Sequence, residues 1–172
     1  MPHKRILIRD AFTAFIDSKI PPGINVTSSL RRDISEEDLP LINVTSGNEE
    51  QEIFNQAPRI YRRTLDVNVE IYAKAKTAIQ DVLDQLAEFL EYIIDREDLF
   101  TLHGEVKEII CLGTNTDING KQAVQESGLE TLRYQVVYDT DAGKYYDAQP
   151  DFDEIFANIS DLVSTEILDI HQ

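Results

Sequence analysis

Thr64-Leu65-Asp66-Val67-Asn68-Val69-Glu70-Ile71-Tyr72 is the stretch that decides the fold, because its apolar and polar residues alternate strictly. The apolar side of this stretch is formed by Leu65, Val67, Val69 and Ile71. A period of two residues is typical of a strand with one buried face and one face toward water. We therefore predict a central strand at this position.

A second strand is predicted upstream, at Asp38-Leu39-Pro40-Leu41-Ile42-Asn43-Val44. A polar stretch from Ser46 to Pro58 separates it from the central strand and is expected to carry the turn. The two segments together predict a hairpin with a long loop. A weaker signal at Val26 to Ile34 fits either a short edge strand or an extended loop.

Two amphipathic helices flank this hairpin. The first is predicted from apolar residues at helical spacing, which are Ile8, Ala11, Phe12, Phe15 and Ile16. It should end at Ile20-Pro21-Pro22-Gly23, because proline has no amide proton and its ring clashes with the preceding turn. The second keeps one apolar face from Ile79 to Ile94, and Thr77-Ala78-Ile79-Gln80 has the form of a capping box.

Two further strands are predicted, at Val106 to Thr114 and at Leu129 to Tyr138. The polar stretch between them, Asn115 to Ser127, contains Asn119-Gly120, a dipeptide that readily forms tight turns. We interpret this region as a second antiparallel hairpin with a projecting loop.

The predicted fold class is α+β, a two-layer sandwich. A mostly antiparallel sheet of about four strands in two hairpins carries two main helices, and residues 1–138 form this domain. Residues 139–172 form an acidic extension with nine acidic side chains and one basic side chain. Its apolar residues still show helical spacing (Ile155, Ile159, Leu162, Val163, Ile167 and Ile170). The stripe fits equally a helix that folds back on its own domain and an arm that docks on a neighbouring subunit.

Composition limits the classes of function. The net charge of −16 disfavours nucleic acid as a simple surface ligand. We expect no membrane span, since no apolar run approaches 18 residues, and therefore a cytoplasmic protein. The single cysteine, Cys111, excludes an internal disulfide and the zinc patterns that need several cysteines.

Motifs for chemistry are weak throughout the chain. No nucleophile motif of the Gly-x-Ser-x-Gly type and no glycine-rich phosphate loop is present. His103-Gly104-Glu105 matches half of a zinc-deaminase signature, whose required pair of cysteines cannot exist here. We therefore predict no catalytic residue, no cofactor and no metal site.

Two groups of arginines stand out in an acidic chain. Arg59, Arg62 and Arg63 lie at the entrance to the central strand, and Arg31 and Arg32 lie before the first hairpin. They would form either a nucleic-acid patch or ion pairs with acids of the same or an adjacent subunit, and we favour the ion pairs.

The element order and three segments resemble the tail terminator proteins of long-tailed phages, the minor tail protein U type. These segments are Leu39-Pro40-Leu41-Ile42-Asn43-Val44, Arg63-Thr64-Leu65-Asp66-Val67-Asn68-Val69-Glu70-Ile71 and Leu132-Arg133-Tyr134-Gln135-Val136-Val137-Tyr138. The resemblance covers residues 4–138. It implies a structural virion protein without catalytic residues, six copies of which form a ring that caps the tail tube, stops its polymerisation and presents the surface for head joining.

The partners implied are therefore further copies of the chain, the major tail tube protein and the head-tail connector protein, with DNA only as passing cargo. The implied locations are the host cytoplasm during assembly and the virion tail. Candidate axial contacts in the two loops are Asn48, Glu49, Glu50, Asn119, Gly120 and Lys121. Candidate contacts between subunits are Arg31, Arg32, Arg59, Arg62 and Arg63.

Two other functions remain open from the sequence. An acidic protein of this size also fits a DNA mimic that inhibits a nucleic-acid enzyme, which would need carboxylates at phosphate-like spacing. A small ligand-binding α+β domain would need a concave pocket with convergent polar groups.

Overall fold

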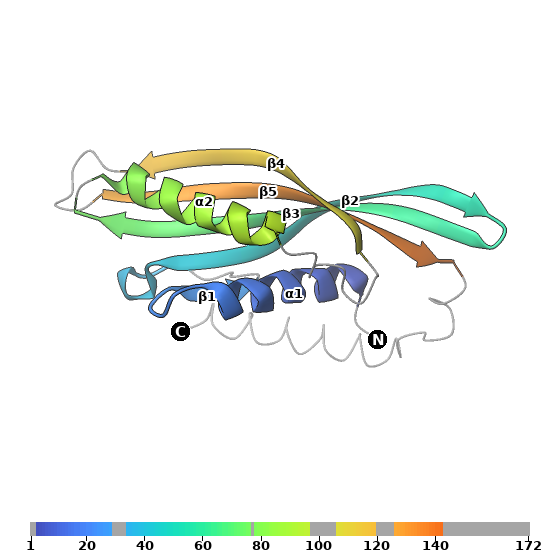
Figure 1. The fold of residues 1–172 in the computed structure, drawn as a ribbon, viewed down its shortest axis with the longest axis horizontal. Helices are drawn as coiled ribbons and strands as arrows, with labels where there is room; N and C mark the ends of the chain where they lie inside the picture. Colours follow the sequence, from blue (N-terminus) through green and yellow to red (C-terminus); the bar gives the residue numbers. More distant parts are fainter. Residues whose placement is uncertain (1–2, 29–33, 77, 97–105, 120–125, 143–172) are drawn as a thin grey trace, which may run out of the picture.

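The computed structural model describes residues 3–28, 34–76, 78–96, 106–119 and 126–142, and these form a long sheet with two helices against it (Figure 1). The elements in chain order are α1 (Lys4–Lys19), β1 (Asn25–Ser28), a short 3-10 helix (Glu36–Asp38), β2 (Leu41–Gln56), β3 (Arg59–Ala75), α2 (Ile79–Arg96), β4 (Val106–Asn119) and β5 (Glu126–Asp141). The predicted α+β class and the two-layer arrangement are confirmed. Among the described residues, none of the helices has the length and apolar character needed to cross a bilayer.

The sheet has the strand order β1-β2-β3-β5-β4. All neighbouring pairs are antiparallel except β1 and β2, which are parallel. β1 is the short edge strand that was one of the two interpretations of Val26 to Ile34; residues 29–33 lie outside the described residues. The sheet therefore has one strand more than the four predicted.

One face of the sheet carries the core, and both helices cover that face. The alternation predicted for the central strand is confirmed, since Leu65, Val67, Val69 and Ile71 have no exposed surface. From α1, Ile8, Phe12 and Ile16 are buried, and Phe12 reaches across to Tyr134 of β5 at 6.0 Å between ring centroids. We call the helix-covered side the inner face and the other side the outer face.

Helix α2 lies close to β5 at Gly128. A Cβ atom at this position would lie 2.7 Å from Leu83 Cδ1 and 3.3 Å from Ile79 Cγ1. Glycine is therefore required here by the space between helix and strand rather than by a turn.

The predicted loop from Ser46 to Pro58 is wrong. β2 continues through this stretch to Gln56, and only Ala57 and Pro58 separate it from β3. Asn48, Glu49 and Glu50 are thus strand residues, with a register shift between Ser46 and Glu49. The polar stretch forms a strand without apolar alternation because this part of the hairpin has exposed side chains on both faces.

Other boundaries also differ from the prediction. α2 begins at Ile79, which follows Ala78 with a φ of 56°, and Thr77 of the predicted capping box lies outside the described residues. β4 extends to Asn119 and β5 begins at Glu126, which shortens the predicted second loop to residues 120–125, outside the described residues. β5 also continues to Asp141, so the predicted domain boundary at residue 138 falls inside a strand.

Candidate functional site: the arm and the outer surface of β4

The hairpin of β2 and β3 projects beyond the helices, at the right of Figure 1. We call residues 49–65 of this hairpin the arm. Near its tip, Ile53 and Phe54 are 55% and 54% exposed, the values expected of residues in open solvent rather than in a core. Two adjacent large apolar side chains on a projecting hairpin are candidates for contact with another molecule.

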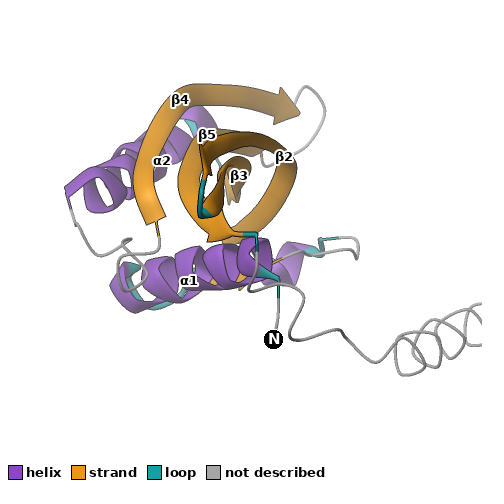
Figure 2. Ribbon diagram, turned by 90° about the vertical axis from the view of Figure 1, so that its right-hand side faces the viewer, coloured by secondary structure: helices purple, strands orange, loops and turns teal. Residues whose placement is uncertain are grey.

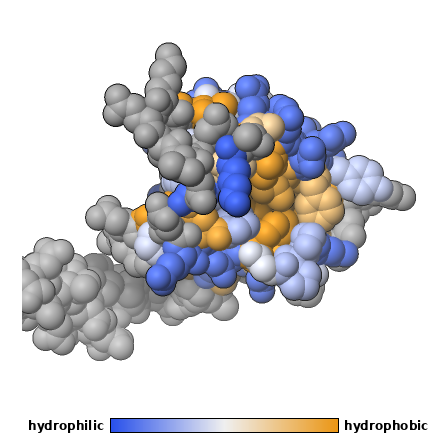
Figure 3. Space-filling view, turned by 90° about the vertical axis from the view of Figure 1, so that its left-hand side faces the viewer, coloured by the Kyte–Doolittle hydropathy of each residue, from blue (hydrophilic) through white to orange (hydrophobic). Residues whose placement is uncertain are grey.

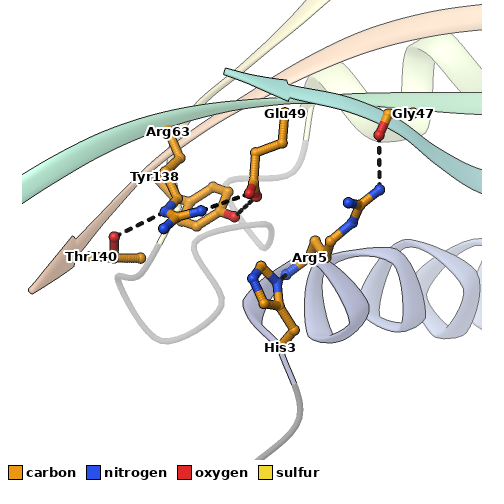
Figure 4. A network of polar contacts seen from close by, with 7 residues as sticks. All are labelled: His3, Arg5, Gly47, Glu49, Arg63, Tyr138 and Thr140. Carbon is orange, nitrogen blue, oxygen red and sulfur yellow. Dashed lines mark hydrogen bonds and ion pairs between the residues drawn. The ribbon is translucent and has the colours of Figure 1, made fainter. Parts of the chain in front are cut away.

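The root of the arm is held by a polar network on the inner face (Figure 4). Arg63 Nη1 lies 2.7 Å from Glu49 Oε2, and Arg63 Nε donates a hydrogen bond to Thr140 Oγ1 at 3.1 Å. The Tyr138 hydroxyl donates to the other carboxylate oxygen of Glu49. Three strands, β2, β3 and β5, are thereby linked at one place.

The first turn of α1 extends this network toward the helix layer. His3 caps the helix through Nδ1, which accepts a hydrogen bond from the amide of Arg5, and Arg5 Nη2 donates to the carbonyl oxygen of Gly47 at 2.8 Å (Figure 4). Lys4 Nζ lies 5.4 Å from the centre of the Tyr138 ring and donates to the carbonyl oxygen of Asp139. The base of the arm is therefore fixed to both layers of the fold.

On the outer face, Arg62 makes a second set of contacts within the chain. Its guanidinium lies 3.7 Å from the centre of the Phe54 ring and 3.1 Å from Asp139 Oδ1. The hydrogen bond that Arg62 donates to Asp139 raises the pKa of Arg62, so this cation stays charged at any physiological pH. Phe54 thus has one ring face against a cation and remains half-exposed.

The candidate arginines fall into three situations. Arg62 and Arg63 form ion pairs with acids of their own chain. Pairing within the chain was one of the two possibilities that the sequence left open for these arginines. Arg59 is exposed beside the tip of the arm, where its carbonyl oxygen accepts from the amide of Ala142. Arg31 and Arg32 lie outside the described residues.

The candidate axial residues are also dispersed. Glu49 is turned into the root network, with its side chain 12% exposed, whereas Asn48 and Glu50 are exposed on β2. Asn119 is the last residue of β4, and Gly120 and Lys121 lie outside the described residues. These residues therefore do not form a common loop surface.

A second exposed apolar surface lies on β4, the edge strand beyond β5. Ile110 and Leu112 are 39% and 46% exposed on the outer face, whereas Ile118, which is 41% exposed, pairs with Gly128 and lies on the inner face. β4 also has register shifts at residues 106–108 and 111–113, and such bulges hinder unspecific pairing along an open edge. Sequence reasoning missed this surface and the arm tip, although the pair Ile53-Phe54 inside a polar stretch was a visible signal.

Beside Leu112, the outer face has a shallow hollow of about 210 Å³. Its lining is Gly47, Asn48, Asp66, Asn68, Leu112, Arg133 and Tyr134. Ligand pockets for drug-sized molecules measure roughly 300 to 1,000 Å³, so this hollow is better matched to one inserted side chain.

Ionisable groups with raised pKa values lie in the sheet, and one of them, Tyr134, also lines this hollow. Burial, together with the charges of Asp84 and Glu91, raises the pKa of Glu130, whose Oε2 is buried without a hydrogen-bond partner among the described residues. Burial and the neighbouring Glu70 raise the pKa of Tyr72 to about 12. Burial also raises the pKa of Tyr134.

These shifts follow from packing and do not form a constellation for acid–base chemistry. Glu130 lies beneath α2 and is 3% exposed, which leaves it no access to a substrate. Within the described ranges, no three His, Cys, Asp or Glu side chains gather closely enough to hold a metal ion.

Comparison with known proteins adds no family. No family model matches the chain, and the search of curated proteins gave no match.

Proposed function

We propose that this protein is a structural, self-associating protein of the phage tail terminator kind, which closes into a ring and caps a tail tube. The observation that carries the proposal is the presence of two exposed apolar surfaces in different parts of the molecule. One is the arm tip with Ile53 and Phe54, and the other is the outer surface of β4 with Ile110 and Leu112. The arm tip belongs to a hairpin that projects beyond the helices, and the outer surface of β4 lies beside the hollow at Leu112.

Two different surfaces on one chain favour a head-to-tail contact between copies. In such a contact the arm of one copy meets β4 of the next, so each copy keeps one surface for a further neighbour. If the rotation between copies closes, the result is a ring with two unlike faces. A ring with one face matched to a tube would block further addition at the tube end.

The chemistry of the two surfaces is compatible. The Phe54 ring would enter a hollow whose wall includes Leu112 and the guanidinium of Arg133. Arg133 is exposed, and a cation over an aromatic face contributes about 0.5 to 1 kcal/mol at an exposed site. The Arg62 and Phe54 contact within the chain is the same kind of interaction.

Mass measurement by light scattering, followed by negative-stain images, tests the proposal. A ring of six copies has a mass of 6 × 19.6 kDa, about 118 kDa. We expect Phe54→Ser to shift the population toward monomer, whereas the matched control Gln51→Ser, also exposed on the arm, should leave it unchanged. A monomeric wild type at every concentration and salt, or equal masses for both variants, would contradict arm-mediated assembly.

Charge gives the assembly a salt dependence of defined sign. Six copies at −16 concentrate 6 × −16, or −96, in one ring, and exposed like charges repel over about 8 to 10 Å near physiological salt. The fraction of ring should therefore increase with salt. Capping itself is tested by adding the protein to polymerising tail tube protein and measuring tube length, which should fall as the ratio of this protein rises.

A specific feature of α2 supports the second candidate, a DNA mimic. One side of the helix carries a row of acids at intervals of three and four residues, which are Asp84, Glu88, Glu91 and Asp95. Successive members rise by about 4.5 to 6 Å along the axis, compared with about 3.4 Å per phosphate along one DNA strand. A monomer or dimer that competes with DNA for a basic protein, and loses this competition in Glu88→Gln/Glu91→Gln, would favour the mimic over the ring.

A further inference from the structure

The two helices lie apart on the inner face, and we call the surface between them the groove. α1 packs on β1 and β2, whereas α2 packs on β3 and β5, and neither helix packs closely along the other. Figure 2, which views the molecule from the arm end, shows α2 and α1 at separate places against the twisted sheet. The sides of the helices that face this gap decide what can lie there.

The side of α1 toward the gap is apolar. Lys4, in the first turn, reaches the carbonyl oxygen of Asp139 on β5, and this contact identifies the side of the helix that faces β5 and α2. Leu7, Ala11 and Phe15 follow Lys4 at intervals of three and four residues and therefore share that side. Leu7 is 40% exposed and Phe15 is only partly buried.

The side of α2 toward the gap is apolar as well. Its acidic row faces the other way, because Asp84 and Glu91 act on Glu130 of β5. The opposite flank carries apolar side chains at helical spacing, namely Val82, Leu86, Phe89 and Ile93. Val82 is 37% exposed, and Leu86 and Phe89 are partly buried.

Figure 3, which views the end opposite the arm, shows apolar side chains in the middle of that end with polar side chains above and below them. Apolar side chains on two neighbouring helices form a surface on which a third amphipathic helix can pack.

We propose that residues 151–170 of the same chain occupy this groove. Their sequence carries the apolar stripe of Ile155, Ile159, Leu162, Val163, Ile167 and Ile170, and six of the remaining positions are acidic. This assignment resolves the two interpretations left open by the sequence in favour of the segment's own domain, and it does not depend on ring formation.

The length of the chain and its point of exit support this occupant. β5 ends at Asp141, two residues after Asp139, which α1 contacts through Lys4 of its first turn. The chain therefore leaves the sheet at one end of the groove. Eight residues, 143–150, span up to about 26 Å, and twenty residues as a helix span about 30 Å, compared with about 24 Å for the 16 residues of α1.

Thiol labelling of the full chain tests the proposal. In a Cys111→Ser background, Leu7→Cys reports on the groove, and Asp17→Cys reports on an exposed position of α1 outside the groove. Each reporter is combined with Ile159→Asp, which puts a charge into the stripe, or with Asn158→Asp, which adds the same charge one position away. If the segment covers Leu7, labelling at this site requires local opening, and Ile159→Asp should accelerate it by about tenfold or more.

The two controls give the result its direction. Asn158→Asp should leave the labelling rate of Leu7→Cys equal to the rate measured without a substitution in residues 151–170. Asp17→Cys should be labelled at the same rate with and without Ile159→Asp or Asn158→Asp. Equal labelling rates at Leu7→Cys with the unchanged segment, with Ile159→Asp and with Asn158→Asp would overturn the proposal. A rate at Leu7→Cys that falls as the protein concentration rises would overturn it too, because the covering segment would then come from a second copy.

Discussion

The root of the arm gives the sharpest prediction, because the pair of Arg63 and Glu49 is largely buried. Their side chains are 17% and 12% exposed. Arg63→Met keeps most of the side-chain volume and removes the guanidinium, so Glu49 is left as a carboxylate with the Tyr138 hydroxyl as its remaining partner in this network. Breaking a fully buried pair costs about 3 to 5 kcal/mol, and an exposed pair is worth about 0 to 1 kcal/mol. For these exposures we expect a loss of about 2 kcal/mol.

Urea unfolding followed by circular dichroism measures this loss directly. In a chain of 172 residues, about 2 kcal/mol corresponds to a fall in Tm of roughly 4 to 8 °C. The matched control is Arg9→Met, which removes the ion pair with Asp10. The side chain of Asp10 is 53% exposed. This control should change the free energy of unfolding by less than about 0.5 kcal/mol.

The reasoning is refuted if Arg63→Met unfolds at the wild-type urea concentration, or if both arginine variants lose the same stability. A further arm of the test is the double variant Arg63→Met/Glu49→Leu. Replacing both partners of a buried pair by apolar residues is often neutral, so the double variant should recover much of what Arg63→Met loses. If the double variant instead loses more free energy of unfolding than Arg63→Met alone, side-chain volume and not charge determines the effect.

Three more predictions follow from the interior of the sheet. Tyr72 should ionise near pH 12 in a spectrophotometric difference titration against Tyr72→Phe. Because the pKa of Tyr72 is higher in the folded than in the unfolded protein, its contribution to stability is complete below pH 10 and is lost as the pH rises to about 12. Glu130→Gln should stabilise the protein at pH 7 by about 1 kcal/mol, with the gain vanishing in acid, because the raised pKa of Glu130 costs stability only where the unfolded carboxyl has ionised. Gly128→Ala should cost about 1 to 3 kcal/mol in urea unfolding, since the new Cβ meets Leu83 Cδ1 at 2.7 Å, and less in a Leu83→Ala background.

The parts of the fold that are buried on one face were predictable from the sequence. Burial imposes a period of two on β3 and about 3.6 on the helices, so Val67 of β3, Phe12 of α1 and Leu83 of α2 were placed correctly in the core. The same rule explains the main error. Residues 50–59 of the arm are exposed on both faces, and nothing in the sequence of this part alternates, so Ser46 to Pro58 was interpreted as a loop.

Long-range polar contacts were beyond the sequence for a different reason. Glu49 and Tyr138 are 89 residues apart, and Arg62 and Asp139 are 77 apart. A chain with 32 acidic residues offers many partners to each arginine, and only the strand register selects among them. The sequence thus favoured ion pairs over a nucleic-acid patch for the arginines but did not identify the partners.

The root network connects the fold to the proposed self-association. A two-stranded ribbon in water is marginally stable by itself, and an arm that moves would lose more conformational freedom on binding. Here β5 pairs with the arm as far as Ile60, and the ion pair of Arg63 and Glu49 links the strands where the helix layer ends. The arm therefore presents Ile53 and Phe54 at a position already determined before any partner arrives. A preorganised apolar tip needs less interface area to reach a given affinity. In the proposed ring, a small contact between one hairpin and one strand would be repeated between all copies, and this repetition would stabilise the assembly.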